Sequence, residues 1–292
     1  MMNLFAFGLG YCACDFIQRY GDLFDTIGAT VRDCEKPRLN GDREVTRFLF
    51  DRDQEDPGII PALAKADMIL VSVPPGISAD PVLAKFGRRI AALQQNLKII
   101  YLSTIGVYGD RQGEWVDEDR IPAPKSDRSM ARMHAEKAWM TLGRDINKTV
   151  HILRLAGIYG PGRNALEALR RGTAHRVVKP GQVFNRIHVA DISATIAELL
   201  LYEGSSDIWN LSDDEPAPPQ DVVTYAAALM QVEPPPEQDI DVATLSPLAH
   251  SFYDENKRAA NRKLKQQLGV TLTYPTYREG LAALWEAGEG RG

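Results

Sequence analysis

A glycine-containing turn near the amino terminus constrains the fold of this chain more than any other feature. Residues 3–7 form a short apolar run, Gly8 and Gly10 follow it, and residues 11–20 have a helical pattern. Gly8 permits a tight turn, Gly10 lets the backbone approach a ligand, and Ala13 lets the helix pack closely on the strand. The first amides of such a helix point a partial positive charge at the turn. The pattern therefore predicts a pyrophosphate site.

The candidate ligand contacts in this turn are Gly8, Gly10, Tyr11, Cys12 and Ala13. Cys12 and Cys14 form a C-x-C pair, but no further metal ligands stand nearby in the sequence, and we interpret both as small packed residues. We predict no metal site.

Composition indicates an ordinary globular protein. The chain has 292 residues, of which 44% are hydrophobic and 25% charged, with a net charge of −5. The positive residues are scattered, so we expect no nucleic-acid partner. Asp15 interrupts an amino-terminal region without a basic leader, and no apolar run is long enough to span a membrane. Together with only three cysteines, these features predict a cytoplasmic protein without a membrane partner.

Apolar strands alternate with helical segments through the first half of the chain. Near-continuous apolar strands of this kind predict an α/β fold, a doubly wound parallel sheet covered by helices on both faces. We expect the strand order 3-2-1-4-5-6 of a Rossmann fold, with a late strand at the edge. Beyond residues 3–7, the expected strands are residues 25–31, 45–50, 67–73, 98–103 and 150–155, the late strand is 207–211, and helices are expected at 81–95 and about 126–142, with Ser126 as N-cap.

The second half of the chain has a looser pattern. Prolines and glycines punctuate it, with Pro218 and Pro219 adjacent and three prolines at 234–236. We predict a dinucleotide-binding domain at residues 1–159 and a smaller carboxyl-terminal lobe at 160–292. About residues 183–212 of that lobe are expected to return to the main sheet.

The residues after the second strand bear on the choice of cofactor. Arg32 and Asp33 follow Val31 there. If Arg32 faces the ligand, its guanidinium suits the 2′-phosphate of NADP. If Asp33 faces it, the 2′-hydroxyl of NAD is favoured. The alternative is that both are solvated charges; we take NADP as the first choice and NAD as the second.

Four spaced motifs, in order along the chain, resemble one known family, the extended short-chain dehydrogenases/reductases of the NAD-dependent epimerase/dehydratase kind. They are LSTIGVYG at residues 102–109, LRLAGIYGPG at 153–162, RIHVAD at 186–191 and WNLS at 209–212. The resemblance implies that Thr104 carries the catalytic hydroxyl and that the backbone of Ala156, Gly157 and Ile158 lines the nicotinamide. We further expect the adenine near Asp51 and Arg52, with Val73 and Pro74 along the ribose path.

One position departs from the family pattern. The family has Y-x-x-x-K on the helix after the fifth strand, with a glutamate four residues after the lysine. If Glu136 is that glutamate, Arg132 stands at the lysine and Arg128 at the tyrosine. A guanidinium cannot exchange a proton at neutral pH as the tyrosine does. The chain is therefore identified as an atypical member that lacks the standard acid/base pair.

Arg128 and Arg132 share one helix face because they are four residues apart. We predict that both point into the cofactor–substrate cleft and bind an anion. The alternative is that one pairs with Glu136 or Asp127 while the other is solvated. Tyr108 is a further candidate proton donor, although a tyrosine in this motif more often packs, and His188 and His134 are weaker candidates.

Two functions remain open at this point. The first is an NADP-dependent oxidoreductase or epimerase-like enzyme acting on a small polar or anionic substrate, with Thr104 polarising the substrate oxygen. The second is a non-catalytic NAD(P)-binding regulatory or sensor protein, for which the small molecule is an effector. A homodimer through the long helices is compatible with the family type, although residue patterns do not establish it.

Overall fold

The computed structural model describes residues 2–33, 44–51, 54–93 and 96–291, and the chain folds into two compact units. Unit 1 comprises Met1–Val107, Pro124–Arg154 and Ile192–Trp209; unit 2 comprises Tyr108–Ala123, Leu155–Asp191 and Asn210–Gly292. Across the described ranges, no helix combines the length and the apolar character needed to cross a membrane.

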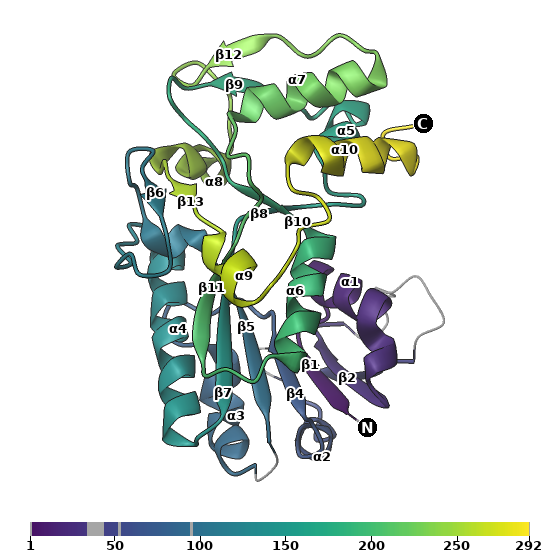
Figure 1. Ribbon diagram of the computed structural model, residues 1–292, viewed down its shortest axis with the longest axis vertical. Helices are drawn as coiled ribbons and strands as arrows, with labels where there is room; N and C mark the ends of the chain where they lie inside the picture. Colours follow the sequence, from purple (N-terminus) through teal and green to yellow (C-terminus); the bar gives the residue numbers. More distant parts are fainter. Residues whose placement is uncertain (1, 34–43, 52–53, 94–95, 292) are drawn as a thin grey trace. The chain divides into compact units, whose positions relative to one another are not determined.

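Seven strands form the central sheet of unit 1 (Figure 1). They are β1 (Asn3–Phe7), β2 (Thr26–Val31), β3 (Thr46–Leu49), β4 (Met68–Val71), β5 (Lys98–Thr104), β7 (Thr149–Leu155) and β11 (Asp207–Leu211). Their order is β11-β7-β5-β4-β1-β2-β3, and β1 pairs in parallel with both β2 and β4. This order confirms the predicted doubly wound topology, with β11 as the late edge strand.

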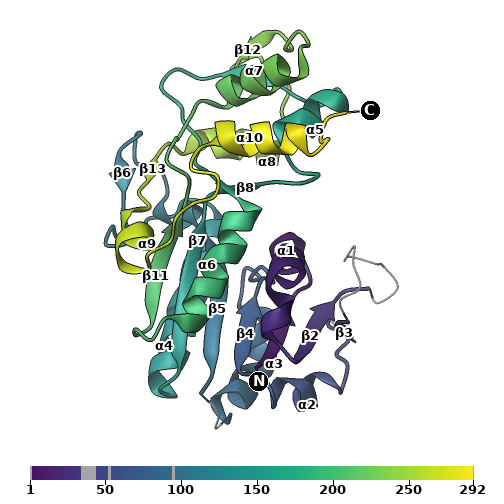
Figure 2. The same cartoon turned by 45° about the vertical axis from the view of Figure 1, so that its right-hand side comes forward.

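Helices cover both faces of this sheet (Figures 1 and 2). They are α1 (Tyr11–Tyr20), α2 (Ile59–Leu63), α3 (Pro81–Ala91), α4 (Asp127–Asp145) and α6 (Val189–Leu201), with 3-10 turns η1 (Gly21–Leu23) and η2 (Ile105–Tyr108). On the face covered by α2, α3 and α4, alternate strand residues such as Phe5, Phe7 and Tyr101 form one buried cluster with Phe86 and Trp139. The intervening strand residues face the other side, where α1 and α6 lie, which explains the continuous apolar strands.

The ends of two helices follow from their capping residues. Ser126 is the N-cap of α4, as predicted, and its hydroxyl accepts a hydrogen bond from the Ser129 amide at 3.2 Å. Asp80 is the N-cap of α3, where its Oδ1 accepts from the amides of Val82 and Leu83 at 2.9 and 3.0 Å. These bonds satisfy amides that have no partner within the helix, so both helices begin at defined residues.

Unit 2 contains three short parallel strand pairs and a small helical core. The pairs are β8 (Gly157–Tyr159) with β10 (Arg186–His188), β9 (Arg176–Val178) with β12 (Glu237–Asp239), and β6 (Trp115–Val116) with β13 (Arg258–Ala259). The helices are α5 (Ala165–Arg170), α7 (Pro219–Met230), α8 (Pro247–Ser251), α9 (Arg262–Gln267) and α10 (Tyr277–Glu286), with the 3-10 turn η3 (Phe252–Asp254). The core packs α5, α7 and α10 around Leu166, Ala226 and Leu281.

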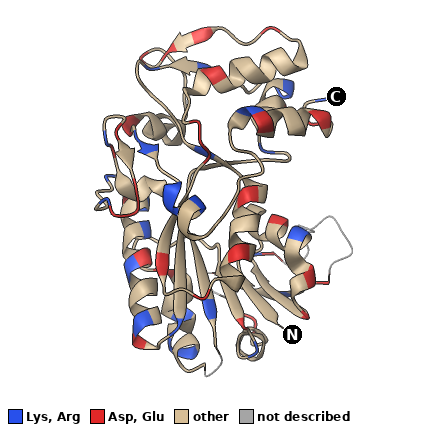
Figure 3. Ribbon diagram, viewed as in Figure 1, with Lys and Arg blue, Asp and Glu red and all other residues tan. Residues whose placement is uncertain are grey.

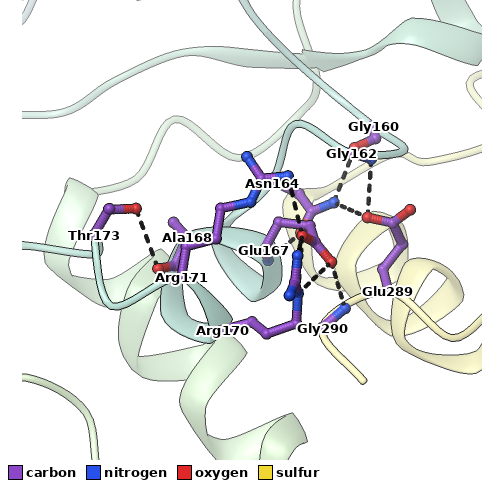
Figure 4. A network of polar contacts seen from close by, with 10 residues as sticks. All are labelled: Gly160, Gly162, Asn164, Glu167, Ala168, Arg170, Arg171, Thr173, Glu289 and Gly290. Atoms are coloured by element: carbon purple, nitrogen blue, oxygen red, sulfur yellow. Dashed lines mark hydrogen bonds and ion pairs between the residues drawn. The ribbon is translucent and has the colours of Figure 1, made fainter. Parts of the chain in front are cut away.

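A polar network ties the end of the chain to α5 (Figure 4). The carboxylate of Glu167 accepts hydrogen bonds from the Gly290 amide at 3.0 Å and from the Arg170 guanidinium at 2.7 Å. The carboxylate of Glu289 accepts from Asn164 and from the Gly162 amide, both at 2.9 Å. These contacts anchor the segment that follows α10.

The division into units differs from the predicted domains. Residues 108–123 belong to unit 2, because β6 pairs with β13 far along the chain. Residues 183–191 also stay in unit 2, where β10 pairs with β8, and only Ile192–Trp209 returns to unit 1. Pairing between distant segments sets these boundaries, and a change of local composition does not reveal it.

Charged residues of both signs are interspersed on the helices of each unit (Figure 3). Along α4, for example, basic and acidic residues follow one another closely. The picture matches the scattered charge pattern of the sequence.

Candidate functional site

The glycine turn between β1 and α1 has the backbone geometry that the motif requires. Gly8 has a φ of +94°, and a Cβ there would stand 2.8 Å from the Ser72 hydroxyl oxygen and 3.0 Å from Cγ2 of Val73. At Gly10 the nearest atom to a Cβ would be the same hydroxyl, 4.0 Å away. Gly8 is therefore required by the fold. A Cβ at Gly10 would meet that one atom at ordinary contact distance, so the backbone there is not crowded, as the close approach of a ligand requires.

The amino end of α1 is suited to an anion. Its N-cap, Gly10, supplies no side-chain hydrogen bond, and the first turn contains no acidic residue. Tyr11 is half-buried, Cys12 is buried and Ala13 is completely buried, so the helix packs tightly behind the turn. The residues present thus fit a pyrophosphate held by backbone amides and the helix dipole.

The residues expected at the adenosine end lie after β2, β3 and β4. Arg32 is exposed directly after β2, Asp33 is half-buried, and Asp51 is exposed after β3. Arg52 lies outside the described residues. Near Asp51 a shallow hollow of about 670 Å³ is lined by Leu49, Gln54, Glu55, Asp56, Pro57 and Lys85.

Val73 and Pro74 follow β4, the strand beside β1. Val73 is half-buried, and its Cγ2 lies next to the place that a Cβ on Gly8 would occupy. Pro74 is exposed. Val73 is therefore close to the glycine turn, as the predicted ribose path requires.

Thr104 is the last residue of β5 and is half-buried. Its hydroxyl oxygen accepts a hydrogen bond from the Gly106 amide at 3.1 Å. This bond fixes the hydroxyl at the carboxyl end of the sheet and leaves its own proton as a donor. Thr104 thus has a local structural role that does not exclude the predicted catalytic one.

Arg132 is held by β5. From α4 its Nη1 donates to the Leu102 carbonyl at 2.6 Å and to the Tyr101 hydroxyl at 3.1 Å, and the guanidinium carbon lies 5.6 Å from the centre of the Tyr101 ring. Burial raises the pKa of Tyr101 against the opposing effect of Arg132, so this phenol stays protonated. Arg128, one turn earlier on α4, is exposed. The two arginines therefore have different surroundings despite sharing a helix face.

Glu136 has a different partner from those considered from the sequence. Arg154 on β7 donates to its carboxylate at 2.8 Å, and the Ser103 hydroxyl donates to it at 2.5 Å. Both charged side chains are almost completely buried. Neither Arg132 nor Asp127 takes part in this group. The alternative that one of the two arginines pairs with Glu136 is therefore wrong, and Glu136 instead forms a three-residue link between α4, β5 and β7.

Asp80 is a buried carboxyl group that the sequence reasoning missed. Besides capping α3, its Oδ2 accepts from the Trp139 indole at 3.3 Å. Burial raises the pKa of Asp80, while its hydrogen bonds and the charge of Arg132 act in the opposite direction. The N-cap pattern Asp-Pro before a helical run was the available signal.

Tyr108 belongs to unit 2 and is completely buried. Its hydroxyl donates to Oδ1 of Asn210 at 2.8 Å. This contact favours packing over proton donation, the alternative noted from the sequence. His188 is likewise buried, and its Nδ1 accepts from the Ala190 amide at 3.2 Å, whereas His134 is exposed on α4.

The segment expected beside the nicotinamide also lies in unit 2. Its amides are used in pairing: Ala156 donates to the Leu211 carbonyl at 2.9 Å and Gly157 to the Asn185 carbonyl at 3.0 Å. Ala156 is buried, Ile158 is half-buried and Gly157 is exposed.

Asp213 in unit 2 is a second carboxyl group that the sequence reasoning missed. It directly follows the WNLS motif and is 2% exposed. Burial raises its pKa to about 8, although the charge of Arg186 acts against the shift. A carboxyl group that keeps its proton near neutrality can donate a hydrogen bond where a carboxylate cannot. Motif matching stopped one residue before it.

No group of metal-ligating side chains is present among the described residues. Cys12 and Cys14 are not joined in a disulfide; the first is buried and the second half-buried. Their surroundings agree with the interpretation as small packed residues.

No protein-family model matches the chain. A solved structure of a putative NAD-dependent epimerase/dehydratase from Methylobacillus flagellatus is similar with a TM-score of 0.72 at 22% identity, covering 98% of each chain. MoeE5 in complex with UDP-glucuronic acid and NAD is similar with a TM-score of 0.75 at 19% identity, covering 96% of each. The fold is thus the Rossmann-like fold of the NAD-dependent epimerases/dehydratases.

Two proteins are more similar in sequence. A functionally unknown conserved protein from Silicibacter pomeroyi DSS has a TM-score of 0.88 and 38% identity, over 99% of this chain and 100% of its own. Protein YeeZ of Escherichia coli K12 is 30% identical over 213 residues, which are 69% of this chain and 73% of YeeZ. The chain belongs to the YeeZ family.

Proposed function

We propose that this protein binds NADP or NAD at the glycine turn of unit 1. The observation that carries the proposal is the pair of glycines: Gly8 is fixed by the fold, while Gly10 is uncrowded, with one atom at 4.0 Å from a Cβ there, beside an α1 terminus without a side-chain cap. The fold is shared with proteins whose structures contain NAD. Titration with both dinucleotides tests the proposal. It would be contradicted if neither dinucleotide bound with a Kd below the millimolar range.

NADP is our first choice because Arg32 is exposed at the end of β2. There its planar guanidinium can donate two hydrogen bonds to a 2′-phosphate. Arg32→Ala should weaken NADP binding by about 1.5–3 kcal/mol, the usual contribution of a charged hydrogen bond, and leave NAD binding nearly unchanged. Tighter binding of NAD than of NADP by the natural protein would favour Asp33 as the ribose contact.

For the reaction, we propose an oxidoreductase or epimerase-like activity on a small polar or anionic substrate. The nicotinamide, when bound, supplies or accepts a hydride. The chain would contribute the hydroxyl of Thr104, whose oxygen is fixed by the Gly106 amide and whose proton can polarise a substrate oxygen. The exposed guanidinium of Arg128 would attract a carboxylate or phosphate.

A non-catalytic regulatory or sensor protein is the second candidate. It is favoured by Arg132, which stands where the family has its lysine and which donates to the Leu102 carbonyl and the Tyr101 hydroxyl. Neither arginine can act as the general acid at neutral pH. Cofactor oxidation and reduction across a panel of carbonyl and alcohol substrates separates the two candidates. Turnover supports the enzyme, and binding without any turnover supports the sensor.

Several expectations stay predictions. They are a small-molecule substrate or effector as the partner, the absence of nucleic-acid and membrane partners, a homodimer, and a cytoplasmic location.

A further inference from the structure

Gly8 is held from both sides by side chains of the neighbouring strands. Its amide donates to the Thr30 hydroxyl oxygen at 2.8 Å, and its carbonyl accepts from the Ser72 hydroxyl at 2.6 Å. Thr30 lies on β2 and Ser72 directly follows β4, and these two strands flank β1 in the sheet. Gly8 is therefore bonded to both neighbours at the point where β1 ends and the turn begins.

Backbone hydrogen bonds also hold the two peptide groups on either side of Gly8. The Leu9 amide donates to the Thr30 carbonyl at 2.9 Å, and the Ser72 amide donates to the Phe7 carbonyl at 2.9 Å. The carbonyl of Gly8 thus points toward β4, while the amide of the same peptide group points toward β2. A peptide group bonded at both ends in this way cannot rotate without breaking both bonds.

Burial makes the bond to Thr30 costly to lose. Thr30 is only 1% exposed, so water cannot replace its hydroxyl as the acceptor for the Gly8 amide. Ser72 is half-buried, and its hydroxyl occupies the space that a Cβ on Gly8 would enter. The Ser72 hydroxyl can therefore bond the Gly8 carbonyl only because residue 8 has no side chain.

We propose that Thr30 and Ser72 are positioning residues that hold the glycine turn in the conformation that receives a pyrophosphate. The inference rests on the proposed function, because it names the residues that preorganise the same site. Neither side chain needs to touch the ligand. Fixing the turn before binding reduces the conformational entropy lost on binding, and this gain applies to ligands that contain a diphosphate.

The experiment compares three substitutions in β2. Thr30→Val removes the hydroxyl with little change of shape, and Thr30→Ser keeps a hydroxyl. Thr26→Val is the matched control, since the Thr26 hydroxyl bonds the Asn3 side chain between the same two strands at their opposite end, at 2.6 Å. Binding of NAD, ADP and adenosine is measured for each protein by calorimetry or NMR titration.

We expect Thr30→Val to raise the Kd for NAD and ADP about tenfold, the effect of losing one buried hydrogen bond, and to leave adenosine binding unchanged. The Kd of Thr30→Ser for NAD and ADP should stay within about twofold of the natural protein's Kd, and Thr26→Val should bind both ligands as the natural protein does. Ser72→Ala should act in the same direction as Thr30→Val. Equal binding of NAD by Thr30→Val and the natural protein would overturn the inference, as would an equal loss for adenosine, which would indicate general destabilisation.

Amide hydrogen exchange without ligand gives an independent readout. The Gly8 amide should lose protection in Thr30→Val and keep it in Thr30→Ser, because the hydroxyl is its acceptor. Unchanged protection in Thr30→Val would overturn the inference. If the natural protein bound none of the three ligands, the proposed function would fail, and this exchange measurement would still decide whether Thr30 holds the turn.

Discussion

Arg154 donates to Oε2 of Glu136 from Nη2 at 2.8 Å and to Oε1 from Nε at 3.2 Å, and both side chains are about 95% buried. The pair joins β7 to α4, the helix that also carries Arg128 and Arg132. The geometry is bidentate, and the Ser103 hydroxyl bonds the same carboxylate. The position of α4 on the sheet therefore depends on an ion pair that is almost completely buried.

Arg154→Met should lower the free energy of unfolding by about 3–5 kcal/mol, because it leaves the Glu136 carboxylate buried without its counterion. Chemical denaturation measures the loss. Arg170→Met is the control: the Arg170 side chain in the pair with Glu167 is 41% exposed, so its loss should cost much less than the loss of Arg154. Similar losses for both variants would show that burial of the Arg154 pair does not determine its contribution.

Gly8→Ala should mainly lower stability, whereas Gly10→Ala should mainly weaken ligand binding. Gly8→Ala should destabilise the fold by about 1–3 kcal/mol or more, because its φ is +94° and the new methyl would meet the Ser72 hydroxyl. Gly10→Ala should cost at most about 1 kcal/mol of stability, yet it should weaken dinucleotide binding at least about tenfold by filling the space at the turn. Thermal unfolding and ligand titration of both variants check this. Normal NAD(P) binding by Gly10→Ala would contradict a pyrophosphate at this position.

Acid should release the carboxyl-terminal segment that Glu167 anchors. Hydrogen bonds from Arg170 and from the Gly290 amide lower the pKa of Glu167 to about 2. Because this pKa lies below the ordinary value of 4.5, the stabilisation is complete above pH 4.5 and is lost as the pH falls toward 2. Hydrogen exchange at Gly290, measured as protection factors between pH 6 and 3, should show the loss.

Glu167→Gln tests the assignment of that effect. It should lower the protection of Gly290 already at pH 6 and flatten its pH dependence, while Glu286→Gln, an exposed carboxylate on α10, should leave the profile unchanged. An unaltered profile in Glu167→Gln would assign the acid sensitivity to other groups.

The natural protein should show little or no turnover of neutral ketones or nucleotide sugars, even with cofactor bound. The prediction assumes that Arg128 and Arg132 stand at the positions of the family's tyrosine and lysine, because a guanidinium cannot exchange the proton as the tyrosine does. It should bind a carboxylate or phosphate ligand in preference, and Arg128→Ala should weaken that binding. Spectrophotometric assays of NAD(P)H and ligand titrations check both points. Robust turnover of neutral substrates would mean that Arg128 and Arg132 do not stand at these two positions or that another group supplies the proton.

The doubly wound fold was predictable because its signals are local. β1 and α1 have the bounds expected from residues 3–7 and 11–20, and the glycines between them mark the turn. The expected strands 25–31 and 98–103 appear as Thr26–Val31 and Lys98–Thr104. Parallel strands buried on both faces need continuous apolar runs, so their positions are visible in the sequence.

The surroundings of the site residues were decided by tertiary structure. Sequence spacing placed Arg128 and Arg132 on one face of α4, but only the packing of α4 on β5 brought Arg132 to the Leu102 carbonyl and left Arg128 exposed. Glu136 was considered as a partner for Arg132, yet Arg154 binds it.

The sequence by itself determined the glycine turn and the class of fold, because the strands, the helices and the turn are visible as local patterns. The strand order was predictable because alternating strands and helices that begin with such a turn favour one doubly wound arrangement. The tertiary structure decided the partners of Glu136 and Asp80, and it decided which segments of the chain belong to each unit. It also placed Thr30 and Ser72 on either side of Gly8, residues separated by 22 and 64 positions in the chain. Such contacts depend on how distant strands and helices pack, and hydrophobic periodicity fixes which face of an element is buried but not which polar groups meet there.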